Sequence, residues 1–212
     1  EGRLSCGSSL IGCTSFFPTK TLACYGDGGA IFTDDDGLAL RMRGLRIHGK
    51  NLTNGTYDRV GATARLDTIQ AAILLAKWPY FEGFIEKRVY VAQRYHTLLS
   101  TLQPLGVKLP SMELAPGRCA FSVYTISLPS EEVRQRVQQE FKASKIGFAV
   151  YYPKCIHLQP LFVEEAKKRG GMPKLPVAEE ASTRVMSLPM HPFLTETEQD
   201  YVVAAIRRVF GQ

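Results

Sequence analysis

The sequence lacks any apolar run near the roughly 18 residues that a membrane-spanning helix needs, and its first residues resemble no secretory signal. These absences predict a cytoplasmic protein. No Cys-x-x-Cys pair occurs among the five cysteines, and the four histidines show no spacing typical of metal ligands. Both observations argue against a zinc site or a disulfide framework, so we expect no metal.

Charge and composition narrow the class of protein further. The 212 residues include 26 Lys and Arg against 20 Asp and Glu, a net charge of +6. The basic residues are interspersed with acidic ones, which argues against binding to nucleic acid or to a membrane surface. A modest basic excess still suits an anionic small-molecule substrate. With 45% hydrophobic residues, the chain can bury a sizeable core.

Hydrophobic periodicity predicts strands that alternate with helices, which is typical of α/β or α+β layers. A helical pattern over 66–102 contains Pro79, which should divide it into two helices. Thr195 and Glu198 have the spacing of a capping box that begins a last helix. The other predicted elements are strands at 10–17, 30–33, 121–128, 146–150 and 185–188, and helices at 38–46, 130–145, 161–168 and 177–184.

A near match to the phosphate-binding P-loop lies between Gly44 and Lys50, which fit the pattern GxxxxGK. Residue 51 is Asn, however, where a P-loop needs Ser or Thr to bind Mg²⁺. The stretch also ends a predicted helix, whereas a P-loop follows a strand and begins a helix. A glycine-rich helix end with basic residues near it is therefore the favoured interpretation.

Lys20 is the candidate for covalent chemistry. It ends the run Ser15–Lys20, between two apolar strand candidates, and the glycine-rich turn Gly26–Ala30 follows. A lysine in such a place should be partly desolvated, which lowers the pKa of its amine and makes it a nucleophile for a carbonyl cofactor. The alternative is an ordinary solvated lysine in a turn. The chemistry requires the Lys20 amine to face a cavity bordered by the Ser15 hydroxyl.

Six short blocks of sequence stand out along almost the whole chain: Ser15–Lys20, Gly26–Ala30, Arg65–Ala72, Tyr152–Pro153, His157–Pro160 and Ser187–Pro192. In this order they resemble the nucleotide-sugar aminotransferases of the DegT/StrS family. The resemblance implies an α/β enzyme dependent on pyridoxal 5'-phosphate (PLP), with the large aminotransferase fold (fold type I). Residues 1–78 would form the C-terminal part of the PLP-binding large domain and a linking helix, and 79–212 a small α+β domain.

The resemblance implies roles for three cofactor-binding residues. The lysine matching Lys20 binds the cofactor covalently, and the serine matching Ser15 binds its phosphate. The segment Gly61–Arg65 matches a loop that reaches into the site of a partner subunit. The family usually has Asn where this chain has Thr63, whose hydroxyl can donate one hydrogen bond to the phosphate.

The resemblance also implies a substrate site. Arg65 matches an arginine near the substrate, where a planar guanidinium suits a carboxylate or a phosphate; its alternative is a solvated residue before a helix. Tyr151 and Tyr152 match a pair that borders the sugar, in which the family often has His at the first position. For His157 and His191 a structural role, with hydrogen bonds beside prolines, is the favoured interpretation. His48 and His96 are expected on helix faces.

The implied function is transfer of an amino group from glutamate to a keto nucleotide sugar, for the synthesis of surface polysaccharide such as lipopolysaccharide. The run Arg65–Ala72 is most similar to members that act on 3-keto sugars, including uronic acids. The implied assembly is a homodimer with shared active sites. The alternative from another class is a non-catalytic dimerisation or binding module without cofactor.

The chain also resembles only the C-terminal part of such an enzyme. The family's aspartate that pairs with the pyridine nitrogen precedes the block equivalent to Ser15–Lys20, and no Asp occurs in 1–14. We therefore expect a fragment that lacks the N-terminal cofactor half and holds PLP poorly on its own, because that acid tunes the cofactor's electronics.

Overall fold

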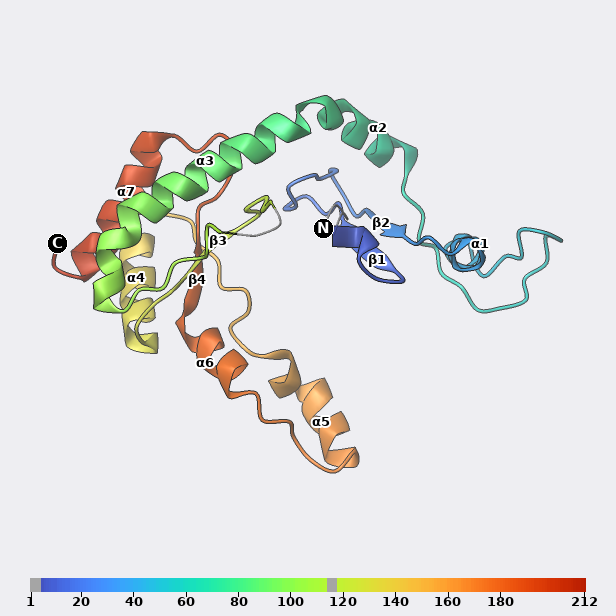
Figure 1. The fold of residues 1–212 in the computed structure, drawn as a ribbon. Coiled ribbons are helices and arrows are strands. Elements are labelled where there is room, and N and C mark those ends of the chain that lie inside the picture. The colour runs from blue at the N-terminus through green and yellow to red at the C-terminus, as the bar shows by residue number, and fades with distance from the viewer. Residues whose placement is uncertain (1–4, 114–117) are drawn as a thin grey trace. The chain divides into compact units, whose positions relative to one another are not determined.

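The computed structural model describes residues 5–113 and 118–212, which form helices and short strands in two compact units (Figure 1). The first unit comprises Glu1–Phe84 and the second Ile85–Gln212. The domain boundary predicted between residues 78 and 79 remains a prediction.

The first unit is built on a β-hairpin whose long connection carries Lys20. Strands β1 and β2 are antiparallel, with Gly12 opposite Phe32 and Ser15 opposite Gly29. Helix α1 follows, and Asp35 caps it because its Oδ1 accepts a hydrogen bond from Leu38 N at 2.8 Å. The elements are η1 (Ser5–Gly7), β1 (Gly12–Ser15), β2 (Gly29–Phe32), α1 (Asp36–Leu45), α2 (Thr68–Lys77) and η2 (Trp78–Tyr80).

Pro79 divides the long helical segment, as the sequence predicts. Helix α2 ends at Lys77, the 3₁₀ turn η2 contains Pro79, and helix α3 spans Phe81–Leu99. Proline has no N–H to donate within a continuous α-helix, so the ladder of hydrogen bonds is interrupted there.

The second unit combines a two-stranded sheet with helices. Strands β3 and β4 are antiparallel, with Tyr124 opposite Leu188. The strand predicted over 146–150 is reduced to a single bridge between Ala149 and Ser187. From Tyr151 onward the chain forms bends and a 3₁₀ turn, so the extended backbone that pairing with β4 requires does not continue. The elements are η3 (Ser100–Leu105), β3 (Tyr124–Ser127), α4 (Glu131–Ala143), η4 (Ile156–Leu158), α5 (Pro160–Lys168), α6 (Pro176–Arg184), β4 (Val185–Leu188) and α7 (Glu196–Val209).

The hydrophobic core lies in the second unit. Tyr95, Tyr124 and Phe141 are fully buried, and helices α4 and α7 lie side by side (Figure 1). The predicted capping box of α7 is confirmed, because Thr195 Oγ1 accepts from Glu198 N at 3.2 Å and the Glu198 carboxylate accepts from Thr195 N at 2.8 Å. This unit therefore has both the buried surface and the local signals of an independent core.

The first unit has little core of its own. Among its described residues, Ala23 and Cys24 are the buried hydrophobic side chains, whereas Ile31 is 57% exposed and Leu75 is 73% exposed. Burial of apolar surface is the main favourable contribution to folding. The contacts that order this unit must therefore be mostly hydrogen bonds and close backbone approaches.

Three further observations concern the described part of the chain. No helix there is long and apolar enough to cross a membrane. No group of three or more potential metal ligands occurs among the residues that the structure describes. The five cysteines are free thiols.

We expect Phe141→Ala to lower the free energy of unfolding by about 3–5 kcal/mol, because it removes a fully buried aromatic side chain and leaves a cavity. The matched control is Phe162→Ala, at a side chain 47% exposed, which should change stability by about 0.5 kcal/mol or less. Urea unfolding followed by far-UV circular dichroism measures both. Equal losses would contradict the placement of the core.

Candidate functional site

Two backbone hydrogen bonds close the loop that carries Lys20. Phe16 N donates to Gly28 O at 2.8 Å, which extends the hairpin by one residue beyond β1. Phe16 O accepts from Cys24 N at 2.9 Å. Both legs of the loop are thus bonded to the same residue, and the connection 17–23 is a closed turn.

Inside this loop, Phe17 links the Ser15 hydroxyl to the Lys20 backbone. Phe17 N donates to Ser15 Oγ at 3.2 Å, and Lys20 N donates to Phe17 O at 2.8 Å. The Ser15 hydroxyl keeps its own hydrogen for donation while it accepts from the backbone. Ser15 and Lys20 therefore lie at the two ends of one short hydrogen-bonded turn.

Cys24 and Gly28 allow the returning leg to lie close to Phe16. The Cys24 thiol is buried, and its Sγ lies 3.0 Å from Phe16 O and 3.1 Å from Gly26 O. A Cβ at Gly28 would lie only 2.8 Å from Cys24 Sγ and 3.0 Å from Leu66 Cδ1. Glycine is required here by the close approach of three segments.

Lys20 itself is exposed, so the desolvation predicted from the sequence is wrong for this chain. The apolar strands flank the loop in sequence, but the first unit has no core that could cover the side chain. Neither Ser15 nor Lys20 lines the pocket beside α1 or the pocket near Tyr201 in the second unit, so the cavity that the chemistry requires is not found in either of them. Lys20 therefore lies on an ordered turn, and the residues that the structure describes do not supply apolar surroundings for its side chain.

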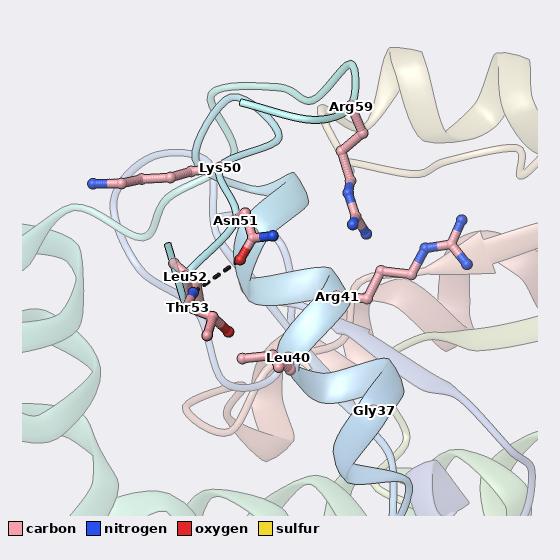
Figure 2. A pocket seen from close by; sticks show the side chains of 9 residues that line it. Gly37, Leu40, Arg41, Lys50, Asn51, Leu52, Thr53 and Arg59 are labelled. Carbon is pink, nitrogen blue, oxygen red and sulfur yellow. Dashed lines mark hydrogen bonds between the residues drawn. The ribbon is translucent and has the colours of Figure 1, made fainter. Parts of the chain in front are cut away.

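One pocket of the first unit lies elsewhere, between α1 and the segment 50–59 (Figure 2). It has a volume of about 330 Å³, and its lining includes Arg41, Lys50 and Arg59. Arg41 and Arg59 extend to one side of the pocket and Lys50 extends to the other (Figure 2). Asp58 Oδ1 accepts from Arg59 Nε at 2.8 Å, and this bond lowers the pKa of the Asp58 carboxyl. The positive charge of Arg59 is therefore largely compensated.

The P-loop alternative is excluded by the position of this segment. Gly44 lies in the last turn of α1, and Gly49, with φ of 80°, donates its N–H to Gly44 O at 3.1 Å. A Cβ at Gly44 would collide with Lys50 O. The glycines therefore let the chain fold back on the end of a helix, and no helix begins after Lys50 as a P-loop requires. His48 lies beyond α1 with φ of 70°, so its predicted place on a helix face is wrong.

Thr63 and Arg65 lie on a segment that runs beside the end of α1. Thr63 pairs with Ile47 in an antiparallel bridge, and its Oγ1 lies 3.4 Å from His48 Nδ1. Both Thr63 and Arg65 are exposed, and Arg65 precedes the first residue of α2 by three positions. The segment is thus held by backbone pairing while its two predicted site residues remain accessible.

Tyr151 and Tyr152 belong to the second unit. Their side chains are 54% and 69% exposed, and their ring centroids are 6.0 Å apart at an interplanar angle of 73°. His157 Nε2 lies 3.0 Å from Glu179 Oε1, and Phe193 N donates to His191 Nδ1 at 3.3 Å. Both histidines have partners within the fold, which favours the structural role predicted for them.

Two residues of α2 that contact the Lys20 loop were not predicted as site residues. Gln70 Oε1 accepts from Tyr25 N at 2.8 Å, and Lys77 Nζ donates to Ala23 O at 2.6 Å. Their spacing of seven places both on one face of the helix. That spacing is visible in the sequence, but only the fold shows which loop the face contacts.

Comparison with known proteins identifies the family. A model of the DegT/DnrJ/EryC1/StrS aminotransferase family matches residues 1–207. The chain belongs to this family. The DegT/StrS resemblance of the sequence blocks is thereby confirmed.

Three relatives illustrate the match. The chain is 41% identical over 206 residues to the UDP-2-acetamido-2-deoxy-3-oxo-D-glucuronate aminotransferase of Pseudomonas aeruginosa, covering 97% of this chain and 54% of that protein. A crystal structure of a family member from Brucella abortus is 40% identical, with a TM-score of 0.84, over 96% of this chain and 52% of that one. The Bacillus subtilis protein NtdA, solved with bound cofactor PMP, is 29% identical, with a TM-score of 0.85, over 96% of this chain and 46% of that one.

The predicted fold class, an α/β part of the PLP-dependent aminotransferase fold, is confirmed by these structures. The chain spans about half the length of the curated relatives it matches. The predicted cofactor agrees with the family and with the cofactor in NtdA. The predicted residues fit PLP chemically, because Lys20 offers an amine for its aldehyde, and Ser15 and, on a separate segment, Thr63 offer hydroxyl donors for its phosphate.

Glu179 gives a pH-dependent test of the region around His157. The hydrogen bond from His157 holds the pKa of the Glu179 carboxyl below its ordinary value, and the Leu175 N–H acts in the same direction. A carboxyl whose pKa is lower in the folded than in the unfolded state contributes fully to stability at pH values above its unfolded-state pKa. This contribution is lost as the pH falls through the folded-state pKa. We expect Glu179→Gln to be less stable than wild type at pH 7, with the difference shrinking below about pH 5.

Urea unfolding at neutral and acidic pH measures the difference between wild type and Glu179→Gln. The control is Glu180→Gln, at a neighbouring carboxylate that pairs with Arg184. Exposed ion pairs of this kind contribute little, so the control should show a smaller change. A difference between Glu179→Gln and wild type that grows on acidification would contradict the assigned role.

Proposed function

We propose that this chain carries the cofactor-binding lysine of a PLP-dependent aminotransferase that converts a keto nucleotide sugar to the amino sugar. Glutamate is the amino donor, the substrate is a 3-keto uronic acid linked to a nucleotide, and the product serves polysaccharide synthesis. The enzyme acts in the cytoplasm as a homodimer with shared active sites.

The observation that carries this proposal is the 41% identity to an aminotransferase named for a 3-oxo-glucuronate substrate, over 97% of this chain. The matched span includes the whole closed loop of Lys20 and the segment with Thr63 and Arg65. The ordered turn that holds Ser15 and Lys20 supports the proposal independently, since it joins an amine to a hydroxyl donor.

In this proposal Lys20 holds the cofactor through Nζ and, once released, carries a proton on Nζ to and from the reacting substrate carbon. PLP supplies the electron sink that makes loss of that proton possible. Ser15 and Thr63 orient the phosphate by donating their hydroxyl hydrogens. An exposed Lys20 needs apolar surroundings for this work, because desolvation keeps an amine unprotonated.

Substrate recognition falls to three other side chains. Arg65 carries a planar cation that pairs with the carboxylate of a uronic acid through two parallel hydrogen bonds. Tyr151 and Tyr152 offer exposed rings and hydroxyls that suit the apolar faces and hydroxyl groups of a sugar. The net charge of +6 favours approach of a nucleotide sugar that bears several negative charges.

The competing function is a non-catalytic binding module, and the exposure of Lys20 is the observation that favours it. A surface lysine without apolar cover has no special reactivity. The two functions differ in one property, which is whether Lys20 captures PLP selectively over other lysines.

We expect the full chain, as its gene encodes it, to develop a visible absorption band with PLP that Lys20→Ala abolishes and Lys50→Ala retains. Lys50 is the matched control because it is the next lysine along the chain and lies on another segment. Aminotransfer from glutamate should fall below detection in Lys20→Ala alone. Equal spectra for the two variants would support the binding module.

Arg65→Gln should lower kcat/KM for a 3-keto uronic acid substrate by about 10–150-fold, because hydrogen bonds to a charged group contribute about 1.5–3 kcal/mol. A neutral 3-keto sugar with the same nucleotide should lose less than about threefold. Arg43→Gln, at an exposed arginine in the last turn of α1, serves as the control for net charge. The same loss with both sugars would remove Arg65 from carboxylate recognition.

A further inference from the structure

We propose that Gln70 and Lys77, on one face of helix α2, are positioning residues that fix the loop of Lys20 and thereby set how fast its amine captures the cofactor. This inference rests on the proposed function of Lys20. Neither side chain is placed at the reacting atoms, so both act through the backbone of the loop.

The first contact fixes the residue after the loop closure. Tyr25 N donates to Gln70 Oε1 at 2.8 Å, and this backbone group directly follows Cys24, which closes the loop on Phe16. A Cβ at Gly26 would lie 3.0 Å from Gln70 Nε2, so glycine lets the amide lie flat against the backbone. The Gln70 side-chain amide thus packs directly against the backbone of Tyr25 and Gly26.

The second contact fixes the residue before the closure. Lys77 Nζ donates to Ala23 O at 2.6 Å and lies 4.3 Å from the centroid of the Tyr25 ring. The ammonium group is therefore shared between a carbonyl and an aromatic face, both of which attract a cation. Lys77 also lies in the last turn of α2, where the helix dipole favours positive charge.

The burial of α2 agrees with these contacts. Gln70, Leu74 and Lys77 are half-buried, whereas Ile69 and Leu75 on other faces are each 73% exposed. A spacing of four and three residues places the half-buried group on one stripe of the helix. The hydrogen bonds of Gln70 and Lys77 bring this stripe to the chain segment 23–25. Ala23 and Cys24 in that segment are the buried hydrophobic residues among those that the structure describes in the first unit.

The consequence for Lys20 follows from its place in the chain. Lys20 precedes Ala23 by three residues, and the outgoing leg is already fixed at Phe16 by Gly28 and Cys24. Helix α2 adds two contacts to the returning leg, at Ala23 and Tyr25, on either side of the closure at Cys24. In a unit with little core, loss of the Lys77 contact frees the turn while the hairpin remains. A freer turn spends less time with the amine oriented for capture, so the rate of covalent bond formation falls.

The test measures capture at Lys20 directly, in the full chain stripped of cofactor. PLP is added, the imine is reduced with borohydride at timed intervals, and the pyridoxyl-labelled peptides are quantified by mass spectrometry. Lys77→Met keeps the length of the side chain but removes the donor and the charge, and we expect capture at Lys20 to slow about tenfold. Lys77→Arg keeps the cation and its donors and should restore the rate to within about threefold of wild type.

Gln70 provides a second, independent pair. Gln70→Leu removes the acceptor for Tyr25 N and should slow capture, whereas Gln70→Glu keeps an acceptor oxygen and should retain most of the rate. The matched control is Lys87→Met, which removes a lysine that lies over the Phe193 ring at 5.4 Å in the second unit and should leave capture unchanged. Slow labelling of Lys50 serves as an internal standard in every sample.

The outcomes separate the two proposals. If wild type captures PLP at Lys20, and Lys77→Met and Gln70→Leu capture it at the wild-type rate, the positioning role is overturned and the proposed function stands. Absence of selective capture at Lys20 in wild type overturns both. If Lys77→Met loses its helical circular dichroism, the comparison of Gln70→Leu with Gln70→Glu tests the positioning role instead. A higher rate in Gln70→Glu than in Gln70→Leu then supports the role, because the two variants differ in the acceptor oxygen for Tyr25 N.

Discussion

The pairing of Phe16 with both Cys24 and Gly28 is the constraint on which the candidate site depends. Phe16 accepts from Cys24 N and donates to the carbonyl of Gly28, the residue before β2. The connection of thirteen residues between β1 and β2 is thereby held as a defined turn. The geometry of Ser15, Phe17 and Lys20 follows from that closure. Because the bonds are between backbone groups, the closure tolerates changes of side chain at most positions in the turn.

The two units are stabilised by different interactions. The second unit buries large aromatic and aliphatic side chains around β3, β4 and the helices α4 and α7. The first unit relies on the loop closure, the capped helix α1 and the contacts of α2, with exposed apolar side chains such as Ile31 and Leu75. The residues with predicted roles in cofactor binding lie in the unit whose order depends on hydrogen bonds. Because few buried contacts hold this unit together, loss of a single hydrogen bond there should affect the placement of these residues more than loss of one hydrogen bond in the core of the second unit.

Features encoded within a few residues were predictable from the sequence. Pro79 separates α2 from α3, and Thr195 with Glu198 begins α7, because each signal acts on backbone groups a few positions away. The order of several sequence blocks along the chain also predicted the family, which the match over residues 1–207 confirms. What the sequence did not predict depends on distant contacts. The exposure of Lys20 follows from the lack of a core, the conformation of His48 from the fold-back on Gly44, and the role of α2 from the approach of Gln70 and Lys77 to Tyr25 and Ala23.

The buried thiol of Cys24 has a consequence for following this loop by experiment. Its Sγ lies between two carbonyl oxygens, and Gly28 and Phe16 cover it. An alkylating reagent reaches this sulfur only after the returning leg has separated from Phe16, whereas Cys13 on β1 is exposed in the folded structure. The ratio of alkylation rates at the two sulfurs therefore reports how often the turn opens. The molecule thus carries a native reporter of loop opening four residues along the chain from Lys20.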